Sequence, residues 1–336
     1  MDRYASLQTW LHHTVGDGLS LSEPIGDASG RRYFRVTLPD GRRHMLMDAP
    51  PERVDCGPFL GMAERLRPQV RVPAVVAFDA AAGFLLLDDL GLADMQTALA
   101  GMDEAAAGRL YLAALDTLIA LQQTPLDGVP DYGAEQMVDD LNRFAEWYAD
   151  KHLGKPLQGD DLAVWERSRS LLVARAQAQP KVLIHFDYHS RNLMVADGGS
   201  EDARIGVLDF QDARVGPLGY DLASLLKDMY VQWPEDFRLD LAIRYWEKAR
   251  KTGLPVAASF DQFYLDFEVM GVFRQVRTLG TFARLAHRDG KPRYIDDMPV
   301  ALAYLRETCM RYAELHPLYK LLNKLTGFQV TTGYTF

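Results

Sequence analysis

The 336-residue sequence has few cysteines, no long apolar stretch and no recognisable signal peptide. Its two cysteines, Cys56 and Cys309, are far apart and too few for a disulfide framework or a cysteine-rich zinc site, so we expect two free thiols. No stretch of 18 residues is apolar throughout, so no membrane-spanning helix is predicted. The N-terminal residues lack the basic and apolar regions of a signal peptide, and we expect a cytoplasmic protein.

The sequence also lacks an excess of positive charge. It has 37 Lys and Arg against 46 Asp and Glu, a formal net charge of −9. A nucleic-acid partner normally requires a basic face, so this balance argues against one. An anionic small molecule such as ATP stays compatible, because one pocket can be positive inside an acidic protein. Nothing in the sequence indicates a protein partner.

Hydrophobic residues make up 48% and charged residues 25%, the balance of a globular protein with a sizeable core. The first quarter of the chain is rich in strand patterns separated by turn residues. We expect helices at 4–14 and 57–66 and strands at 21–25, 31–38, 43–48, 74–79 and 83–88.

Beyond residue 91 long helical patterns dominate. We expect helices at 103–122, 134–150, 158–178, 235–252, 258–286 and 295–315, with short strands at 181–187, 192–195 and 204–210. The predicted class is α+β, with a β-rich nucleotide-binding lobe at 1–91 and a larger helical catalytic and substrate-binding lobe at 92–336. A ligand would bind in the cleft of such a bilobal fold.

The strongest motif surrounds Asp187. His185, Asp187 and Asn192 keep the His-x-Asp-x4-Asn spacing of a kinase catalytic loop, and Asp209-Phe210 follows at the end of an apolar run. Phosphoryl transfer needs a carboxylate near the acceptor hydroxyl and divalent cations on the phosphates. We therefore predict Asp187 as the catalytic base and Asn192 and Asp209 as ligands of Mg²⁺.

Two other interpretations use the same residues. Asp187 could simply cap a turn, as buried aspartates in loops often do. Alternatively, His185, Asp187 and His189 alternate along the chain and would share one face of a strand, as in some hydrolytic metal sites. That second interpretation leaves Asn192 and Asp209 without a role.

Three further segments are candidate site elements. The turn containing Gly26, Ser29, Gly30, Arg31 and Arg32 lies between two predicted strands and could place backbone N–H groups and positive charge on phosphates.

The segment with Asp88 and Leu90 lies at the lobe boundary, where a kinase offers backbone groups to adenine. Asp221, near the start of a helix, is expected to brace the catalytic loop rather than to act in catalysis.

Together these motifs resemble the aminoglycoside phosphotransferase family, which has the protein-kinase-like fold. The likeness rests on residues 26–36, 86–91, 185–192, 208–210 and 219–223. It implies ATP, Mg²⁺ and a small hydroxylated acceptor. One departure is clear: the strand that carries a lysine in kinases has Met47 or Asp48 at that place, which leaves Glu64 without the usual partner. Arg31, Arg32 or Arg43 could supply the missing charge.

Within that family the chain is similar to bacterial kinases of cell-wall recycling, which phosphorylate the anomeric hydroxyl of N-acetylmuramate and N-acetylglucosamine. The narrower likeness is carried by residues 44–51, 87–91, 143–148, 210–217 and 273–280. Open alternatives are a kinase for an aminoglycoside or choline-like alcohol and a nucleotide-binding pseudokinase. Candidate acceptor contacts, from their placement near the motifs or in helices that could wall the pocket, are His189, Arg191, Gln211, Asp212, Arg143 and Arg274.

Overall fold

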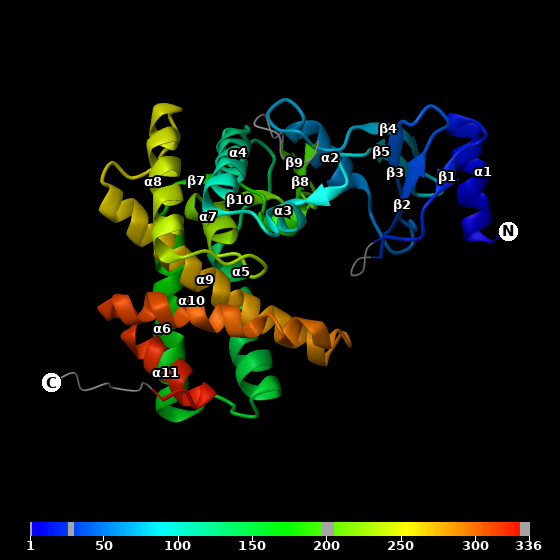
Figure 1. Ribbon diagram of the computed structural model, residues 1–336. Helices are drawn as coiled ribbons and strands as arrows, with labels where there is room; N and C mark the ends of the chain where they lie inside the picture. The colour runs from blue at the N-terminus through cyan, green and yellow to red at the C-terminus, as the bar shows by residue number, and fades with distance from the viewer. Residues whose placement is uncertain (1, 26–29, 197–204, 330–336) are drawn as a thin grey trace. The chain divides into compact units, whose positions relative to one another are not determined.

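The computed structural model describes residues 2–25, 30–196 and 205–329 (Figure 1). Packing divides the chain into two compact units, Met1–Thr124 with Arg191–Ala213 and Pro125–Ser190 with Arg214–Phe336. We call them the sheet unit and the helical unit and describe each by itself. The functional division at residue 91 remains a prediction.

The sheet unit is built on a five-stranded antiparallel sheet of order β1-β2-β3-β5-β4. Its strands are β1 (Ser20–Leu21), β2 (Arg32–Thr37), β3 (Arg43–Asp48), β4 (Val75–Asp79) and β5 (Phe84–Asp88). Side chains alternate between the two faces of a strand. Helix α1 (Arg3–Val15) covers one face, where its Leu7 and Leu11 form a buried cluster with Phe34, Val36, Leu38, Leu46, Phe84 and Leu86.

The opposite face carries the odd-numbered residues of β2 and β3. Helix α2 (Gly57–Leu66) buries Phe59, Met62, Ala63 and Leu66 and leaves Glu64 exposed. The Phe59 ring stacks on Phe210 with centroids 5.1 Å apart. Met47, at the place where kinases carry a lysine, is fully buried. An apolar contact therefore joins α2 to the segment that follows Asp209.

The rest of the sheet unit brings distant segments together. Strands β6 (Ala93–Asp94), β8 (Leu193–Val195) and β9 (Ile205–Val207) form an antiparallel sheet of order β6-β8-β9. Two helices follow β6 in the chain, α3 (Met95–Leu99) and α4 (Glu104–Gln122). Asp94 and Asp103 cap them by accepting from the N–H groups of Thr97 and Ala106.

In the helical unit, α9 contacts α5, α6, α7, α8 and α10 (Figure 1). The helices are α5 (Ala134–Arg143), which continues as a π-helix over Phe144–His152, α6 (Gly159–Ala178), α7 (Gly219–Leu226), α8 (Glu235–Lys251), α9 (Phe260–His287), α10 (Met298–Arg311) and α11 (His316–Thr326). Strands β7 (Lys181–Ile184) and β10 (Arg214–Pro217) pair antiparallel. Along the described ranges, no helix has the length and apolar character needed to cross a membrane.

Most predicted elements agree with these bounds within a few residues. Several are shorter than predicted. The strand from residue 181 ends at Ile184, the strand at 204–210 covers only Ile205–Val207, and the strand at 21–25 covers only Ser20–Leu21 with an isolated bridge from Ile25 to Tyr33. The helix from 134 changes to π-helical geometry at Phe144, and the helix at 295–315 is α-helical only over Met298–Arg311. Both cysteines are free, as predicted, and both are buried. The sequence also predicts a turn at 197–200, between the strands at 192–195 and 204–210, and that turn lies outside the described residues.

Gly280 sets how closely α9 can approach the preceding helical segment. A Cβ atom at Gly280 would lie 2.5 Å from the carbonyl carbon of Arg143 and 2.6 Å from the amide nitrogen of Phe144. We expect Gly280→Ala to lower the free energy of unfolding by about 1–3 kcal/mol, because backbone atoms cannot move aside as a flexible side chain can. Urea denaturation measures this change.

Gly61 on α2 is the matched control, because a Cβ atom there meets nothing within 4 Å. Gly61→Ala should raise the free energy of unfolding by about 0.5–1 kcal/mol, since alanine is the better helix former. Equal stabilisation by both substitutions would contradict the close approach of α9.

Candidate active site

The sheet unit contains a pocket of about 440 Å³, which we call the sheet pocket. Its walls come from the uncovered sheet face, from the segment after β5, and from the ends of β8 and β9. The lining includes Ile25, Tyr33, Arg35, Met45, Phe59, Leu87, Asp88, Asp89, Leu90, Gly91, Asn192, Met194, Leu208, Asp209, Phe210 and Gln211. Apolar walls with a few polar groups are typical of a ligand pocket.

One end of the sheet pocket is the turn after β5. The Arg35 guanidinium donates from Nε to Asp89 Oδ2 at 2.8 Å and from Nη2 to the Gly91 carbonyl at 3.1 Å. Asp89 is 3% exposed, so this ion pair holds a buried charge in place. Gly91 has φ +139°, and a Cβ atom there would meet the Val195 carbonyl oxygen at 2.9 Å. Arg35 therefore fixes the turn containing Asp88 and Leu90.

The other end of the sheet pocket carries Asn192 and Asp209. Strands β8 and β9 pair Leu193 with Val207, and the Leu208 N–H donates to the Asn192 carbonyl at 2.9 Å. Asn192 precedes β8 and Asp209 follows β9, so both lie at the same end of this strand pair. Asp209 has φ +59°, an uncommon conformation for a non-glycine residue that often marks a functional site. Two oxygen donors thus line one end of the pocket.

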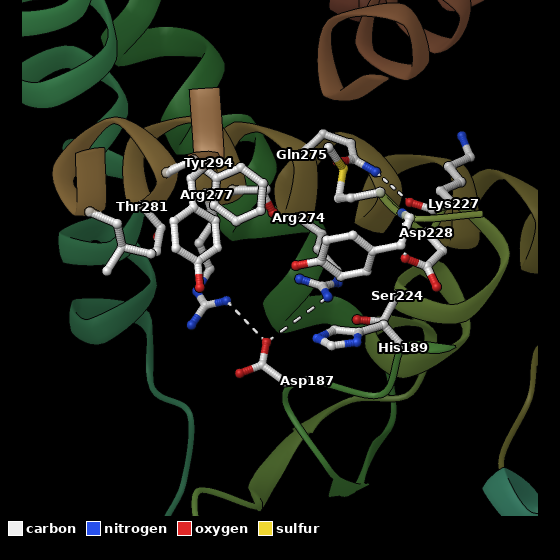
Figure 2. Close-up of a pocket in the computed structure, with 15 residues that line it drawn as sticks. Asp187, His189, Ser224, Lys227, Asp228, Arg274, Gln275, Arg277, Thr281 and Tyr294 are labelled. Atoms are coloured by element: carbon white, nitrogen blue, oxygen red, sulfur yellow. Dashed lines mark hydrogen bonds and ion pairs between the residues drawn. The ribbon is translucent and has the colours of Figure 1, made fainter. Parts of the chain in front are cut away.

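The helical unit contains a second pocket of about 190 Å³, which we call the helix pocket. Its lining includes Asp187, His189, Ser224, Lys227, Asp228, Tyr230, Arg274, Gln275, Arg277, Thr278, Thr281 and Tyr294. Figure 2 shows Arg274 and Arg277 directed toward Asp187, with their guanidinium nitrogens 4.0 and 3.9 Å from its Oδ1. The Asp187 side chain is 41% exposed and so accessible from the pocket.

The charge of Asp187 is set by these neighbours. Burial is the largest influence and would raise the pKa of Asp187, but the guanidinium groups of Arg277 and Arg274 outweigh it together, and the pKa is lowered. His189 and His185 act in the same direction when protonated. Asp187 is therefore an ionised carboxylate, able to accept a hydrogen bond from a hydroxyl group.

Asp221 of α7 holds the loop that carries Asp187. Its carboxylate accepts from the N–H of His185 at 2.6 Å and from the N–H of Phe186 at 3.1 Å. Burial raises the pKa of Asp221 to about 7, although both N–H bonds oppose the rise. Phe186 has φ +81°, which these bonds help to maintain. The predicted bracing role of Asp221 is confirmed.

A second carboxylate, Asp140, holds Arg277 and Arg143 in place. Asp140 of α5 accepts from Tyr132 Oη at 2.8 Å and from Arg277 Nε at 3.2 Å, and pairs with Arg143 at 2.6 Å. The Arg277 guanidinium also lies 4.1 Å from the centroid of the Phe186 ring. The Arg277 guanidinium thus lies close to Asp140, Asp187 and the Phe186 ring in the absence of a ligand.

The lining of the helix pocket includes buried polar atoms that have no hydrogen-bond partner among the described residues. Ser224 Oγ, Gln275 Oε1 and Thr281 Oγ1 are such atoms. An unsatisfied buried donor or acceptor costs free energy comparable with a lost hydrogen bond. The helix pocket is therefore suited to a ligand with several hydroxyl or amide groups.

The predicted site residues fall into separate groups. In the sheet pocket are Asp88, Leu90, Asn192, Asp209 and Gln211, and in the helix pocket are Asp187, His189 and Arg274. Gly30 is exposed beside Val54. Asp212 is exposed. Arg191 donates to Gln96 on the surface, and Arg143 reaches Arg277 only through Asp140. Gly26 and Ser29 lie outside the described residues.

Arg32 is engaged by a buried carboxylate. It lies on the α1 side of β2, where its Nη2 is 2.5 Å from Oδ2 of the fully buried Asp48, which also pairs with Arg3. Because Tyr33 and Arg35 face the sheet pocket, alternation along the strand directs Arg32 away from it. The nucleotide-binding role predicted for Arg32 stays a prediction, and this position does not favour it.

The metal-site interpretation of the His185 segment does not match the geometry. The Nδ1 atom of His185 accepts the Asp187 N–H at 3.3 Å, and the His189 ring packs against Tyr230. Among residues 2–25, 30–196 and 205–329, no three His, Cys, Asp or Glu side chains gather closely enough to hold a metal ion.

Several lining residues were missed by the sequence analysis, above all Arg277, Thr278 and Thr281 on α9. Together with the predicted Arg274 they repeat at helical spacing, so they share one face of an otherwise apolar helix. That polar stripe in a buried helix is a signal that sequence alone carries. Arg35 and Asp89 gave no comparable signal.

Comparison with known proteins points to one family. The model of the phosphotransferase enzyme family matches residues 20–257. An N-acetylmuramate/N-acetylglucosamine kinase from Neisseria meningitidis is 44% identical over the whole of both chains. A protein of the same name from Pseudomonas aeruginosa is 45% identical over 96% of this chain and 97% of its own.

Solved structures share the fold. An ADP-bound aminoglycoside phosphotransferase, APH(2'')-Ib, superposes with a TM-score of 0.59 at 14% identity, covering 90% of this chain and 98% of its own. An ethanolamine kinase from Plasmodium vivax gives a TM-score of 0.62 at 12% identity, covering 95% and 88%. The predicted α+β kinase-like fold and the predicted family are confirmed. The family model and the full-length relatives together establish that the chain belongs to the phosphotransferase enzyme family.

Proposed function

We propose that the protein is an ATP-dependent kinase that phosphorylates the anomeric hydroxyl of N-acetylmuramate and N-acetylglucosamine in the cytoplasmic recycling of cell-wall sugars. The observation that carries the proposal is an ionised Asp187 between two arginines in a pocket with unsatisfied polar groups, in a chain whose full-length relatives bear the name of this kinase. An acceptor hydroxyl bound beside Asp187 is in the position from which a proton can be removed.

The sheet pocket is the proposed nucleotide site. Its apolar walls at Met45 and Leu87 suit a flat base, and the turn at Asp88–Gly91 offers backbone groups to the edge of that base. Asn192 and Asp209 provide an amide and a carboxylate oxygen, the hard donors that Mg²⁺ takes alongside phosphate oxygens. Bound there, the ion would neutralise charge on the phosphates.

Asp187 orients the acceptor hydroxyl and takes its proton as the oxygen bonds to the γ-phosphorus of ATP, the bond from that phosphorus to the β–γ bridging oxygen breaks, and ADP leaves. Arg274 and Arg277 keep the carboxylate ionised before the reaction and stay beside it afterwards. Asp221 keeps the carboxylate in position through the backbone of His185 and Phe186. Arg274, Arg277 and Asp221 therefore act on the charge or the position of the Asp187 carboxylate.

The helix pocket favours an uncharged or anionic acceptor over a polycation. Ser224, Gln275 and Thr281 can bond to sugar hydroxyls or to an N-acetyl group, and Arg274 can pair with the lactyl carboxylate of N-acetylmuramate. An aminoglycoside would bring several positive charges toward Arg274 and Arg277. The second candidate function, aminoglycoside phosphorylation, is therefore not favoured.

A substitution at the proposed base tests the function. Asp187→Asn keeps the size of the side chain and removes the proton acceptor, so kcat with N-acetylmuramate and N-acetylglucosamine should fall about 10²–10⁴-fold. ADP release measured over a panel of these sugars, aminoglycosides and choline identifies the acceptor. Asp240→Asn on the exposed surface of α8 is the control and should keep full activity.

Three outcomes would contradict the proposal. They are turnover with aminoglycosides or choline alone, nucleotide binding without ADP release for any acceptor, and an Asp187→Asn variant within tenfold of the unaltered protein.

The pH dependence tests the role of the arginines. Because the pKa of Asp187 is lowered, the acid limb of kcat/KM should lie below the ordinary aspartate pKa of about 4. Arg274→Met removes one of the two cations, so the pKa of Asp187 rises and the limb moves to higher pH. Arg244→Met, at an exposed ion pair on α8, should leave it unchanged. An acid limb that stays in place in Arg274→Met would contradict this electrostatic role.

A further inference from the structure

The sheet unit must bind an anionic nucleotide without lysine. Residues 1–150 and 191–213 contain no lysine at all, so any side-chain cation of the sheet pocket is an arginine. Kinases place a lysine on the strand that corresponds to β3, where this chain has the fully buried Met47 followed by Asp48. The cation that replaces the lysine must therefore come from a different place in the sheet unit.

The arginines within β2 and β3 are already engaged. Arg32 faces α1 and pairs with the buried Asp48. Arg35 bonds to Asp89 and to the Gly91 carbonyl, and Arg43 lies 3.9 Å from the same Asp89 carboxylate. Moving Arg35 to a phosphate would leave the nearly buried Asp89 without its closest cation, which is unfavourable for a buried carboxylate.

Arg31 directly precedes β2 and has a different position. Tyr33 and Arg35 line the sheet pocket, and if their alternation is continued one step beyond the start of β2, Arg31 falls on the same face as Tyr33. Its side chain is hydrogen-bonded to the Tyr33 hydroxyl. Because Arg35 marks the end of the pocket at Asp89, Arg31 is displaced toward the opposite end.

That opposite end is where Asp209 lies. The pKa of Tyr33 is raised chiefly by burial, lowered by the charge of Arg31 and raised by the charge of Asp209, so both charges are close to one hydroxyl group. Tyr33 and Asp209 both line the pocket. A nucleotide with its base beside Leu87 and Leu90 would direct its phosphates toward Asp209, and hence toward Arg31.

We propose that Arg31 binds the phosphates of the nucleotide in place of the strand lysine of kinases, and that the Tyr33 hydroxyl positions it. A guanidinium can bond to two phosphate oxygens at once, which a lysine ammonium cannot do in the same plane. This inference rests on the proposed use of ATP in the sheet pocket, and it does not depend on which sugar is the acceptor.

Isothermal titration calorimetry without an acceptor tests this role. With Mg²⁺ present, Arg31→Met should bind ADP about tenfold to a hundredfold more weakly, because charge-assisted bonds to phosphate are lost, and should bind adenosine within twofold of the unaltered protein. Tyr33→Phe should weaken ADP binding less than Arg31→Met does. Arg31→Lys should keep part of the affinity, since it retains the charge.

Arg42→Met is the matched control, because Arg42 pairs only with Asp40 in the exposed turn between β2 and β3 and should bind ADP normally. Arg31→Gln, which loses the charge and keeps a polar group near Tyr33, is measured in parallel in case the Met variant is unstable.

ADP affinity within twofold of the unaltered protein in Arg31→Met and Arg31→Gln would overturn the inference, as would an equal loss of ADP and adenosine binding. A protein that binds ADP through Arg31 but phosphorylates no amino sugar would contradict the proposed acceptor and leave the role of Arg31 supported.

Discussion

The buried carboxylate of Asp221 is the constraint on which the helical unit depends. It accepts two backbone N–H groups from the residues just before Asp187, and it lies on α7, which packs against α9. The same α9 presents Arg274 and Arg277 to Asp187, so one pair of helices fixes both the position of the Asp187 carboxylate and the charge around it. Helix α9 in turn approaches the chain at Arg143 so closely that residue 280 has no room for a side chain.

Both units use arginine and aspartate in the same way. In the sheet unit, Arg35 holds Asp89 and thereby the turn at one end of the sheet pocket. In the helical unit, Asp140 holds Arg277. A buried charge without a partner is costly, so each pair constrains the backbone that carries it. The site is thus ordered by ion pairs that are complete before a ligand binds.

Sequence alone predicted the parts of the site that lie close together in the chain. The His185–Asn192 spacing, Asp209 and the bracing role of Asp221 depend on local motifs, and hydrophobic periodicity was enough for most helices and strands. Arg277 and Arg35 act through Asp140 and Asp89, which are 137 and 54 residues away, and no local pattern encodes such pairs. The pairing of Arg32 with Asp48 is equally hidden from the sequence, because only the register of β2 and β3 decides which neighbouring arginine faces Asp48.

The loss of the strand lysine changes more than the identity of one cation. In protein kinases the lysine pairs with a helix glutamate, so the position of that helix controls phosphate binding. Here Met47 is buried, Glu64 is exposed, and α2 instead contacts the segment after Asp209 through the stack of Phe59 on Phe210. The cation that we propose for the phosphates directly precedes β2 and is bonded to Tyr33, a residue of the same strand. Its bond to Tyr33 therefore lies within one strand segment, whereas the kinase lysine pairs with a glutamate on a separate helix.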